Sequence, residues 1–144
     1  MTITKAAVNT VIDDRCGAFL VEARRMTGDA TKPSINQCIG WAVRQLGFPT
    51  AALTDVSDSD LSAVPDGKAD ALLDLTELRT LQSIETNLTA VTSETGPVSD
   101  EWNDLSKRLA AIIPRKQATI MAQHGIALDK PLDTLKRKAH MRAV

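Results

Sequence analysis

Two long segments of helical leucine spacing, separated by a glycine–proline pair, constrain the fold of this chain more than any other feature. Apolar residues recur at steps of three and four over residues 68–90, and again over residues 98–124. Gly96 and Pro97 lie between the two segments and cannot easily continue a helix. Two helices joined by so short a turn must lie antiparallel to one another. The sequence therefore predicts a long antiparallel helix hairpin.

Upstream of this hairpin, the spacing of apolar residues predicts two more helices and a single helical turn. The first helix covers residues 4–26, with Thr4 as its N-terminal cap. The second helix covers residues 35–46 and stops at Gly47, which can adopt the left-handed conformation that ends many helices. In the aspartate-rich stretch that follows, residues 59–64 can form one helical turn.

No segment alternates apolar and polar residues as a half-buried strand does, so the predicted fold class is all-α. We expect a small helical bundle over residues 1–125, built on the long hairpin, and an extended C-terminal tail over residues 126–144. Hydrophobic residues make up 43% of the chain and charged residues 24%, which is typical of a globular domain. Since no apolar run is long enough to cross a bilayer, we expect a soluble protein made in the cytoplasm.

Charge is divided unevenly along a chain whose net charge is only −1. Seven acidic residues and one basic residue lie between Asp55 and Glu77, whereas five basic residues and one acidic residue lie between Lys130 and Arg142. The C-terminal segment is either a solvated tail or a docking peptide that orders on a partner. The candidate docking residues are three leucines at helical spacing and five cations: Leu128, Lys130, Leu132, Leu135, Lys136, Arg137, Lys138 and Arg142.

The residue types that usually carry catalysis or hold metals form no recognisable pattern. Cys16 lies on an apolar helical face, where a cysteine is typically a buried hydrophobic residue. His124 ends the last predicted helix, where a cation complements the helix dipole. Asp74 and Glu77 lie on the preceding long helix and are predicted to face solvent. The acidic loop that starts at Asp55 does not fit the ligand spacing of an EF-hand, and no glycine-rich phosphate loop occurs. We therefore expect no enzyme, no cofactor and no metal site.

The hairpin itself carries the run ADALLDLTELRTLQSIETNLTAV, followed after a GP pair by EWNDLSKRLAAIIPRKQATIMAQHG. Together with the upstream SINQCIGWAVRQLGF and the loop TDVSDSDLSAV, this pattern resembles the adaptor, or head-to-tail connector, proteins of long-tailed bacteriophages. The shared features are a short helix ending in Leu-Gly, an aspartate-rich loop, a leucine-rich helix, a short turn and a long closing helix. The resemblance covers residues 34–125 and rests on a leucine pattern, without a catalytic motif.

This resemblance implies a structural virion protein without chemistry of its own. Adaptors of this family form a ring beneath the portal protein, extend the channel through which packaged DNA passes, and receive the next connector (stopper) or tail protein. The resemblance implies a ring that matches the roughly twelvefold symmetry of the portal, with no membrane contact. It assigns portal engagement to residues 126–144, the ring body to the two long helices, and contact with a neighbouring subunit or ring to residues 50–66.

Four side chains are candidates for contacts between subunits. Trp102 opens the last helix on its apolar stripe, which fits either core packing or an intersubunit anchor, and Asp55, Asp58 and Asp60 lie in the acidic loop.

An alternative is a small helical DNA-binding or regulatory protein whose basic C-terminal tail contacts phosphates. Residues 34–46 would then form a recognition helix. Arg44 is the only cation of that helix, which gives little support for binding in a DNA groove.

Overall fold

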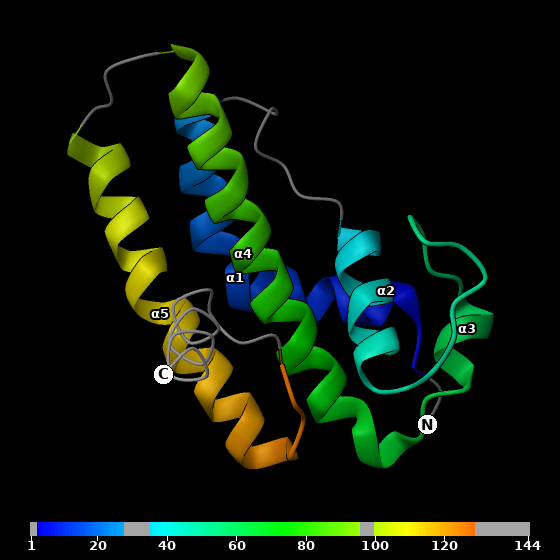
Figure 1. The fold of residues 1–144 in the computed structure, drawn as a ribbon. Coiled ribbons are helices and arrows are strands. Elements are labelled where there is room, and N and C mark those ends of the chain that lie inside the picture. Colours follow the sequence, from blue (N-terminus) through cyan, green and yellow to red (C-terminus); the bar gives the residue numbers. More distant parts are fainter. Residues whose placement is uncertain (1–2, 28–34, 96–99, 129–144) are drawn as a thin grey trace, which may run out of the picture.

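The computed structural model describes residues 3–27, 35–95 and 100–128, with side chains over residues 3–22, 35–87 and 103–128. Across these residues the chain is mostly helical and contains no strand, which confirms the all-α class. Figure 1 shows the elements, which in chain order are α1 (Lys5–Thr27), α2 (Ile35–Gln45), α3 (Asp58–Ser62), the 3₁₀ helix η2 (Asp66–Lys68), α4 (Ala69–Thr95) and α5 (Asp100–His124).

The helix bounds differ most from the predicted segments at the facing ends of the two long helices. α4 runs to Thr95 rather than to Ala90, and α5 begins at Asp100 rather than at Val98. The predicted bounds were placed where the apolar residues end, but polar residues can continue a helix beyond the end of its buried face. Residues 96–99, which include the predicted glycine–proline turn, lie outside the described residues.

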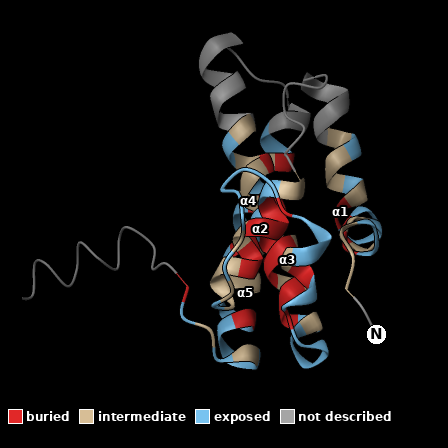
Figure 2. Cartoon of the chain, turned by 90° about the vertical axis from the view of Figure 1, so that its right-hand side faces the viewer, coloured by how far each residue is buried: buried red, intermediate tan, exposed pale blue. Residues whose placement is uncertain are grey.

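Helix α4 is the centre of the bundle. It packs against α1, α2 and α5, and Figure 1 shows α5 running antiparallel beside it. Figure 2 shows the buried residues gathered where these helices meet. Three leucines of α4 are fully buried, and they share one core with residues from the other elements: Leu72, Leu75, Leu78, Val8, Ile12, Ile39, Val43, Leu61, Leu105, Leu109 and Ile120.

The ends of the helices follow from local sequence. Thr4 accepts the backbone N–H of Ala7 at 3.2 Å, which confirms its predicted role as the cap of α1. Gly47 follows α2 with a φ of 92°, and Gly125 follows α5 with a φ of 63°. Residues with a side chain rarely adopt these left-handed conformations, so both glycines allow the chain to leave its helix sharply.

Candidate functional site

The predicted docking segment begins at a fixed point on the bundle. After Gly125 the chain returns to the helices, and Leu128 is only 6% exposed because it belongs to the core. Leu128 lines a surface cavity of about 330 Å³ together with Trp41, Leu78 and Gln117. Leu128 is thus bound within its own chain instead of being presented to a partner, since the turn at Gly125 folds it back onto the helices.

The other predicted docking residues lie outside the described residues: Lys130, Leu132, Leu135, Lys136, Arg137, Lys138 and Arg142. Trp102 belongs to the first turn of α5, and its side chain also lies outside the described ones. The chain's other tryptophan, Trp41, is half-buried, with the Arg79 guanidinium 5.2 Å from its ring centroid. Of the predicted docking residues, only Leu128 lies within the described part of the chain.

The three aspartates proposed as contact residues lie on α3 and on the loop before it. Asp55 and Asp58 are exposed, and Asp60 is half-buried. Asp58 accepts the backbone N–H of Lys5 at 2.8 Å, so α3 also fixes the start of α1. Asp60 and Ser57 form a reciprocal capping box, and the bond from the Ser57 backbone N–H is the main cause that lowers the pKa of Asp60. Asp55 likewise accepts the backbone N–H of Val56 at 2.8 Å, so all three carboxylates are already engaged by backbone N–H groups.

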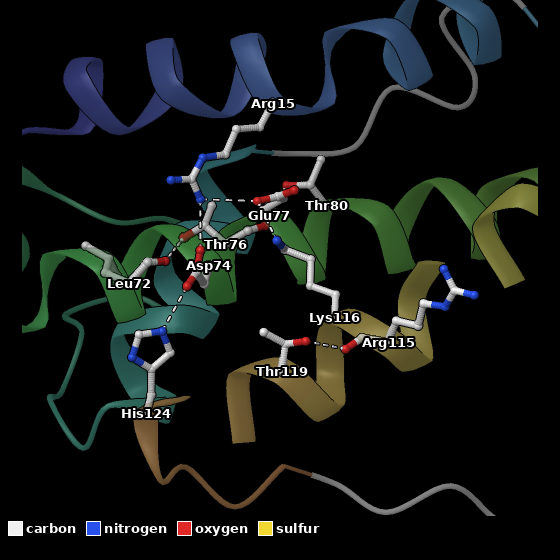
Figure 3. Close-up of polar contacts among 10 residues, drawn as sticks. All are labelled: Arg15, Leu72, Asp74, Thr76, Glu77, Thr80, Arg115, Lys116, Thr119 and His124. Atoms are coloured by element: carbon white, nitrogen blue, oxygen red, sulfur yellow. Dashed lines mark hydrogen bonds and ion pairs between the residues drawn. The ribbon is translucent and has the colours of Figure 1, made fainter. Parts of the chain in front are cut away.

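Five ionisable side chains from three helices meet beside α4, as Figure 3 shows, and we call them the ionic cluster. Arg15 of α1 donates to Asp74 Oδ1 at 2.9 Å and to Glu77 Oε2 at 3.2 Å. From α5, Lys116 Nζ lies 2.8 Å from Glu77 Oε2, and His124 Nε2 lies 2.8 Å from Asp74 Oδ2. Two carboxylates of α4 thereby connect α1 and α5.

The ionic cluster corrects the prediction that Asp74 and Glu77 face solvent. Their side chains are only 22% and 15% exposed, because α1 and α5 cover this part of α4. One sequence signal was available, since residues three apart on a helix share a face. Arg15 lies 59 residues from Asp74, however, and no local pattern indicates that the two meet. The dipole explanation of His124 was likewise incomplete, because it did not anticipate the bond to Asp74.

Hydrogen bonds within the ionic cluster favour the charged forms of Asp74 and Arg15. Burial tends to raise the pKa of Asp74, but hydrogen bonds from His124 and Arg15, together with the charge of Lys116, outweigh burial and lower that pKa below its ordinary value. Burial likewise tends to lower the pKa of Arg15, and the bonds to Asp74 and Glu77 outweigh it and raise that pKa. At neutral pH, Asp74 and Arg15 are therefore both charged and form an ion pair.

The two cysteines are buried and free, so they behave as core residues. Burial is the main cause that raises the pKa of the Cys16 thiol to about 12, and it also raises the pKa of Cys38. The thiolate is the nucleophilic form of cysteine, and this environment suppresses it. The predicted burial of Cys16 is confirmed.

Beside the ionic cluster, a shallow groove of about 280 Å³ lies between α4 and α5. Ile112 and Ile120 form its apolar lining. Its polar lining combines side chains of the ionic cluster with others of α5: Asp74, Glu77, Lys116, Arg115, Thr119 and Gln123. We call it the α4–α5 groove. In Figure 3 the Arg115 guanidinium points away from the carboxylates of the ionic cluster.

Within the described parts of the chain, no group of three or more His, Cys, Asp or Glu side chains is placed to hold a metal ion. In the same described parts, no helix has the length and apolar character needed to span a membrane. No family model, no curated protein and no solved structure matches this chain.

Proposed function

We propose that this chain is a structural virion protein, the adaptor of a phage head-to-tail connector. Its copies form a ring that joins the portal protein to the next connector or tail protein and extends the DNA channel. The proposal starts from the resemblance of residues 34–125 to that family. The described helices have the element order that the resemblance implies, with α2, an aspartate-rich loop, the leucine-rich α4 and the long α5 in succession.

The observation that carries the proposal is the way the C-terminal segment leaves the bundle. Leu128 is buried in the core, and the basic residues begin two positions later at Lys130. A docking peptide needs such a fixed point of attachment, because a partner that binds the peptide is then held at a defined place relative to the helical bundle. The basic segment 129–144 is accordingly the portal-docking element in this proposal.

The chemistry of the ionisable groups also supports a structural role. Asp74 has a lowered pKa and two cationic or histidine partners, whereas a general acid or base needs a pKa near the working pH. Cys16 has a pKa of about 12, so its sulfur is a poor nucleophile at neutral pH. The ionic cluster instead holds three helices in register, as the body of a ring requires.

The division of charge fits assembly from identical copies. Acidic residues lie exposed at Asp55 and Asp58, and basic residues predominate after Leu128. An acidic surface and a basic segment on one chain favour heterologous contacts, and such contacts close into a ring when they are repeated by rotation.

Electron microscopy of purified virions or connector complexes tests the proposal. We expect density for this chain as a ring of long helices between the portal and the tail, with residues 129–144 against the portal. Its absence from particles would overturn the proposal. A charge reversal, Arg137→Glu, should reduce portal binding in a pull-down, whereas the matched reversal Lys107→Glu on the exposed side of α5 should leave it unchanged.

The DNA-binding alternative has less support. Arg44, the only cation of α2, donates to Thr50 Oγ1 at 2.8 Å and so serves its own chain. A helix that reads a DNA groove presents several cations and amides to the bases. Titration of duplex DNA at increasing salt separates the two functions, because phosphate contacts give a steep loss of affinity with salt. We expect no such binding, and a steep salt dependence would favour the alternative.

A further inference from the structure

Among the side chains that the structure describes, three large hydrophobic residues are exposed, and two of them lie on long helices of the bundle. Val21 of α1 is 65% exposed, and Met121 of α5 is 39% exposed. The third, Leu53, lies in the loop between α2 and α3. A single exposed apolar residue needs no explanation by itself. Val21 and Met121 are informative because each belongs to a helix face that is directed away from the core.

The first of these faces lies on α1. This helix turns Val8, Ile12 and Cys16 towards the core. On the opposite side, residues at steps of three and four along the helix are exposed, so they share one face. We call them the α1 face: Ala7, Thr10, Asp14, Ala18 and Val21. This face is uncharged apart from its one carboxylate.

The second face lies on α5. Leu105, Leu109 and Ile120 of this helix belong to the core. The opposite side is exposed at the same helical spacing, and we call it the α5 face: Ala111, Pro114, Ala118, Met121 and Ala122. Arg115 is exposed at the edge of this face, and Figure 3 shows its guanidinium directed away from the carboxylates of the ionic cluster. The α5 face is therefore apolar, with a cation at its edge.

The two faces carry charges of opposite sign that their own chain leaves unpaired. Asp14 and Arg115 are exposed, and neither side chain has a hydrogen bond or an ion pair with another residue in the described part of the chain. Asp13, which is also exposed, adds to the negative charge beside Asp14. The nearby cations of both helices are instead paired with acidic side chains of their own chain: Arg15, Arg108 and Lys116. Charge complementarity therefore favours contact between the α1 face of one copy and the α5 face of another.

Contacts within one chain show how α1 and α5 are aligned along the bundle. Arg108 Nη2 lies 2.7 Å from Glu22 Oε1. Arg15 and Lys116 both contact Glu77 Oε2, at 3.2 Å and 2.8 Å. Between these two points α1 runs back by seven residues while α5 runs forward by eight. The two helices are therefore antiparallel, and a step along one matches an equal step back along the other.

The same alignment extends to a neighbouring copy. Rotation about an axis parallel to the bundle keeps every residue at its own height along that axis. Val21 of one copy is then level, to within about two residues, with Ala111 of the next. Asp14 is level with Arg115 to the same precision, and Met121 falls against the first turns of the α1 face. One arrangement thus brings together the unpaired charges and both exposed apolar residues.

We propose that the α1 face of one copy of this chain packs against the α5 face of the next copy, antiparallel, with Val21 against Ala111 and Asp14 beside Arg115. This contact rests on the proposed function, because the ring of that proposal supplies the rotation. It is heterologous, since it joins two different faces, and its repetition by rotation closes a ring. A single contact of this kind is weak, and it becomes effective when it is repeated around the closed ring.

Cysteine cross-linking between single variants tests both the contact and its alignment. Val21→Cys mixed with Ala111→Cys, and Ala7→Cys mixed with Ala122→Cys, place exposed thiols at matching heights. A disulfide requires Cα atoms within about 7 Å of each other. Under mild oxidation at high protein concentration, we expect a mixed covalent dimer from both mixtures. Each variant carries one new cysteine, and the two native cysteines are buried, so this bond joins two chains.

The crossed mixtures are the matched controls, Val21→Cys with Ala122→Cys and Ala7→Cys with Ala111→Cys. They use the same four thiols, but the partners lie about three turns, or about 16 Å, apart along the helix in the proposed alignment. We expect several-fold less mixed dimer from them. Equal yields from all four mixtures would overturn the contact, because random collision would explain them. Higher yields from the crossed mixtures would also overturn it, because the two faces would then pack parallel.

Charge reversal gives an independent check on the mixture that joins positions 21 and 111. Asp14→Arg on the first chain should lower the yield of mixed dimer about two- to fivefold, as the loss of one exposed ion pair does. Arg115→Asp on the second chain should restore the yield. Asp70→Arg, at an exposed position of α4 outside both faces, is the control and should leave the yield unchanged. An equal loss with Asp70→Arg, or no recovery with Arg115→Asp, would overturn the assigned ion pair.

These outcomes are separable from those of the proposed function. An aligned mixed dimer from a chain that is absent from virions would preserve the contact and remove the adaptor role. A ring seen in connectors whose subunits show no cross-link between positions 21 and 111 would preserve the adaptor role and remove this contact.

Discussion

His124 Nε2 lies 2.8 Å from Asp74 Oδ2, so the last residue of α5 is hydrogen-bonded to a carboxylate near the start of α4. The same carboxylate accepts a hydrogen bond from Arg15 of α1 at 2.9 Å. Asp74 is therefore a shared acceptor for two helices, and it holds the end of α5 close to where the C-terminal segment begins. Removing its charge should affect both neighbours together.

Asp74→Asn should lower the free energy of unfolding by about 1–2 kcal/mol. A hydrogen bond to a charged group contributes more to stability than a neutral one, and the partial exposure of Asp74 reduces this contribution. Urea denaturation followed by circular dichroism measures the loss. The control is Asp13→Asn, an exposed aspartate of α1, for which we expect a change of about 0.5 kcal/mol or less. Equal effects of the two substitutions would show that the ionic cluster contributes nothing to stability.

Acid should destabilise the fold partly through Asp74. Its pKa is lowered in the folded chain from an ordinary value of 3.8, so the folded state binds its proton less readily than the unfolded state does. The stabilising contribution is present above the ordinary pKa and is lost as pH falls through the lower folded pKa. Arg15, Lys116, His124 and Glu77 are the charged or ionisable groups that face it.

Denaturation measured from neutral pH down to about pH 3 should show this loss. The slope of unfolding free energy against pH should be smaller for Asp74→Asn than for the original chain in the acidic part of the range. An unchanged slope would mean that the pKa of Asp74 is the same in the folded and unfolded states.

Thiol accessibility gives a direct test of the core around α1 and α2. Cys16 and Cys38 are buried, and burial raises the pKa of Cys16 to about 12. A thiol reagent at pH 8 should therefore leave both unlabelled in the native protein and label both in urea. Leu53→Cys is the positive control and should react at once, because position 53 is exposed. Rapid labelling of either native cysteine would contradict the packing of α1 and α2 on α4.

The sequence predicted most of the helices because their signals are local. Thr4 and Gly47 mark helix ends, and the leucine spacing of α4 identifies its buried face. The ionic cluster could not be predicted in the same way. It depends on which helices cover Asp74 and Glu77, and that is decided by tertiary packing, not by neighbours in the chain.

The tertiary contacts of Leu128 could not be predicted from its neighbours in the sequence either. Its spacing from Leu132 and Leu135 suggested an anchor for a partner, whereas the turn at Gly125 returns it to its own core. The exposure of Leu53 also has no local signal, because it depends on the path of the loop in which Arg44 donates to Thr50 and Thr50 donates to the Ala52 carbonyl. Sequence periodicity could not predict the burial of residues whose positions depend on the path of a loop.

Leu128→Ala tests whether Leu128, just before the basic C-terminal segment, is packed in the core of the folded chain. A buried leucine loses apolar contacts on truncation, and we expect a loss of about 1–3 kcal/mol, towards the lower end of the range for core leucines because Leu128 borders a surface cavity. Leu53→Ala makes the identical chemical change at an exposed position and should alter the unfolding free energy by about 0.5 kcal/mol or less. Denaturation of both variants in parallel measures the difference. Equal losses would show that Leu128 is not packed in solution.

Pro114 lies inside α5, where a proline has no N–H to donate to the carbonyl of Ala110. Pro114→Ala restores that donor and removes the clash of the ring with the preceding turn, which together are worth up to about 3 kcal/mol. The unfolded chain gains freedom when proline is lost, which offsets about 0.4–1 kcal/mol of this gain. Because Pro114 is exposed and fills no core space, we expect a net rise of about 1–2 kcal/mol in the free energy of unfolding.

Thermal and urea denaturation measure this rise, with Lys107→Ala as the control for a substitution at an exposed position of the same helix. That control should change stability by about 0.5 kcal/mol or less. A lower free energy of unfolding for Pro114→Ala would contradict this expectation. Proline bends helices, and a loss of stability would show that α5 needs a bend at Pro114 to bring both Lys116 and His124 against α4.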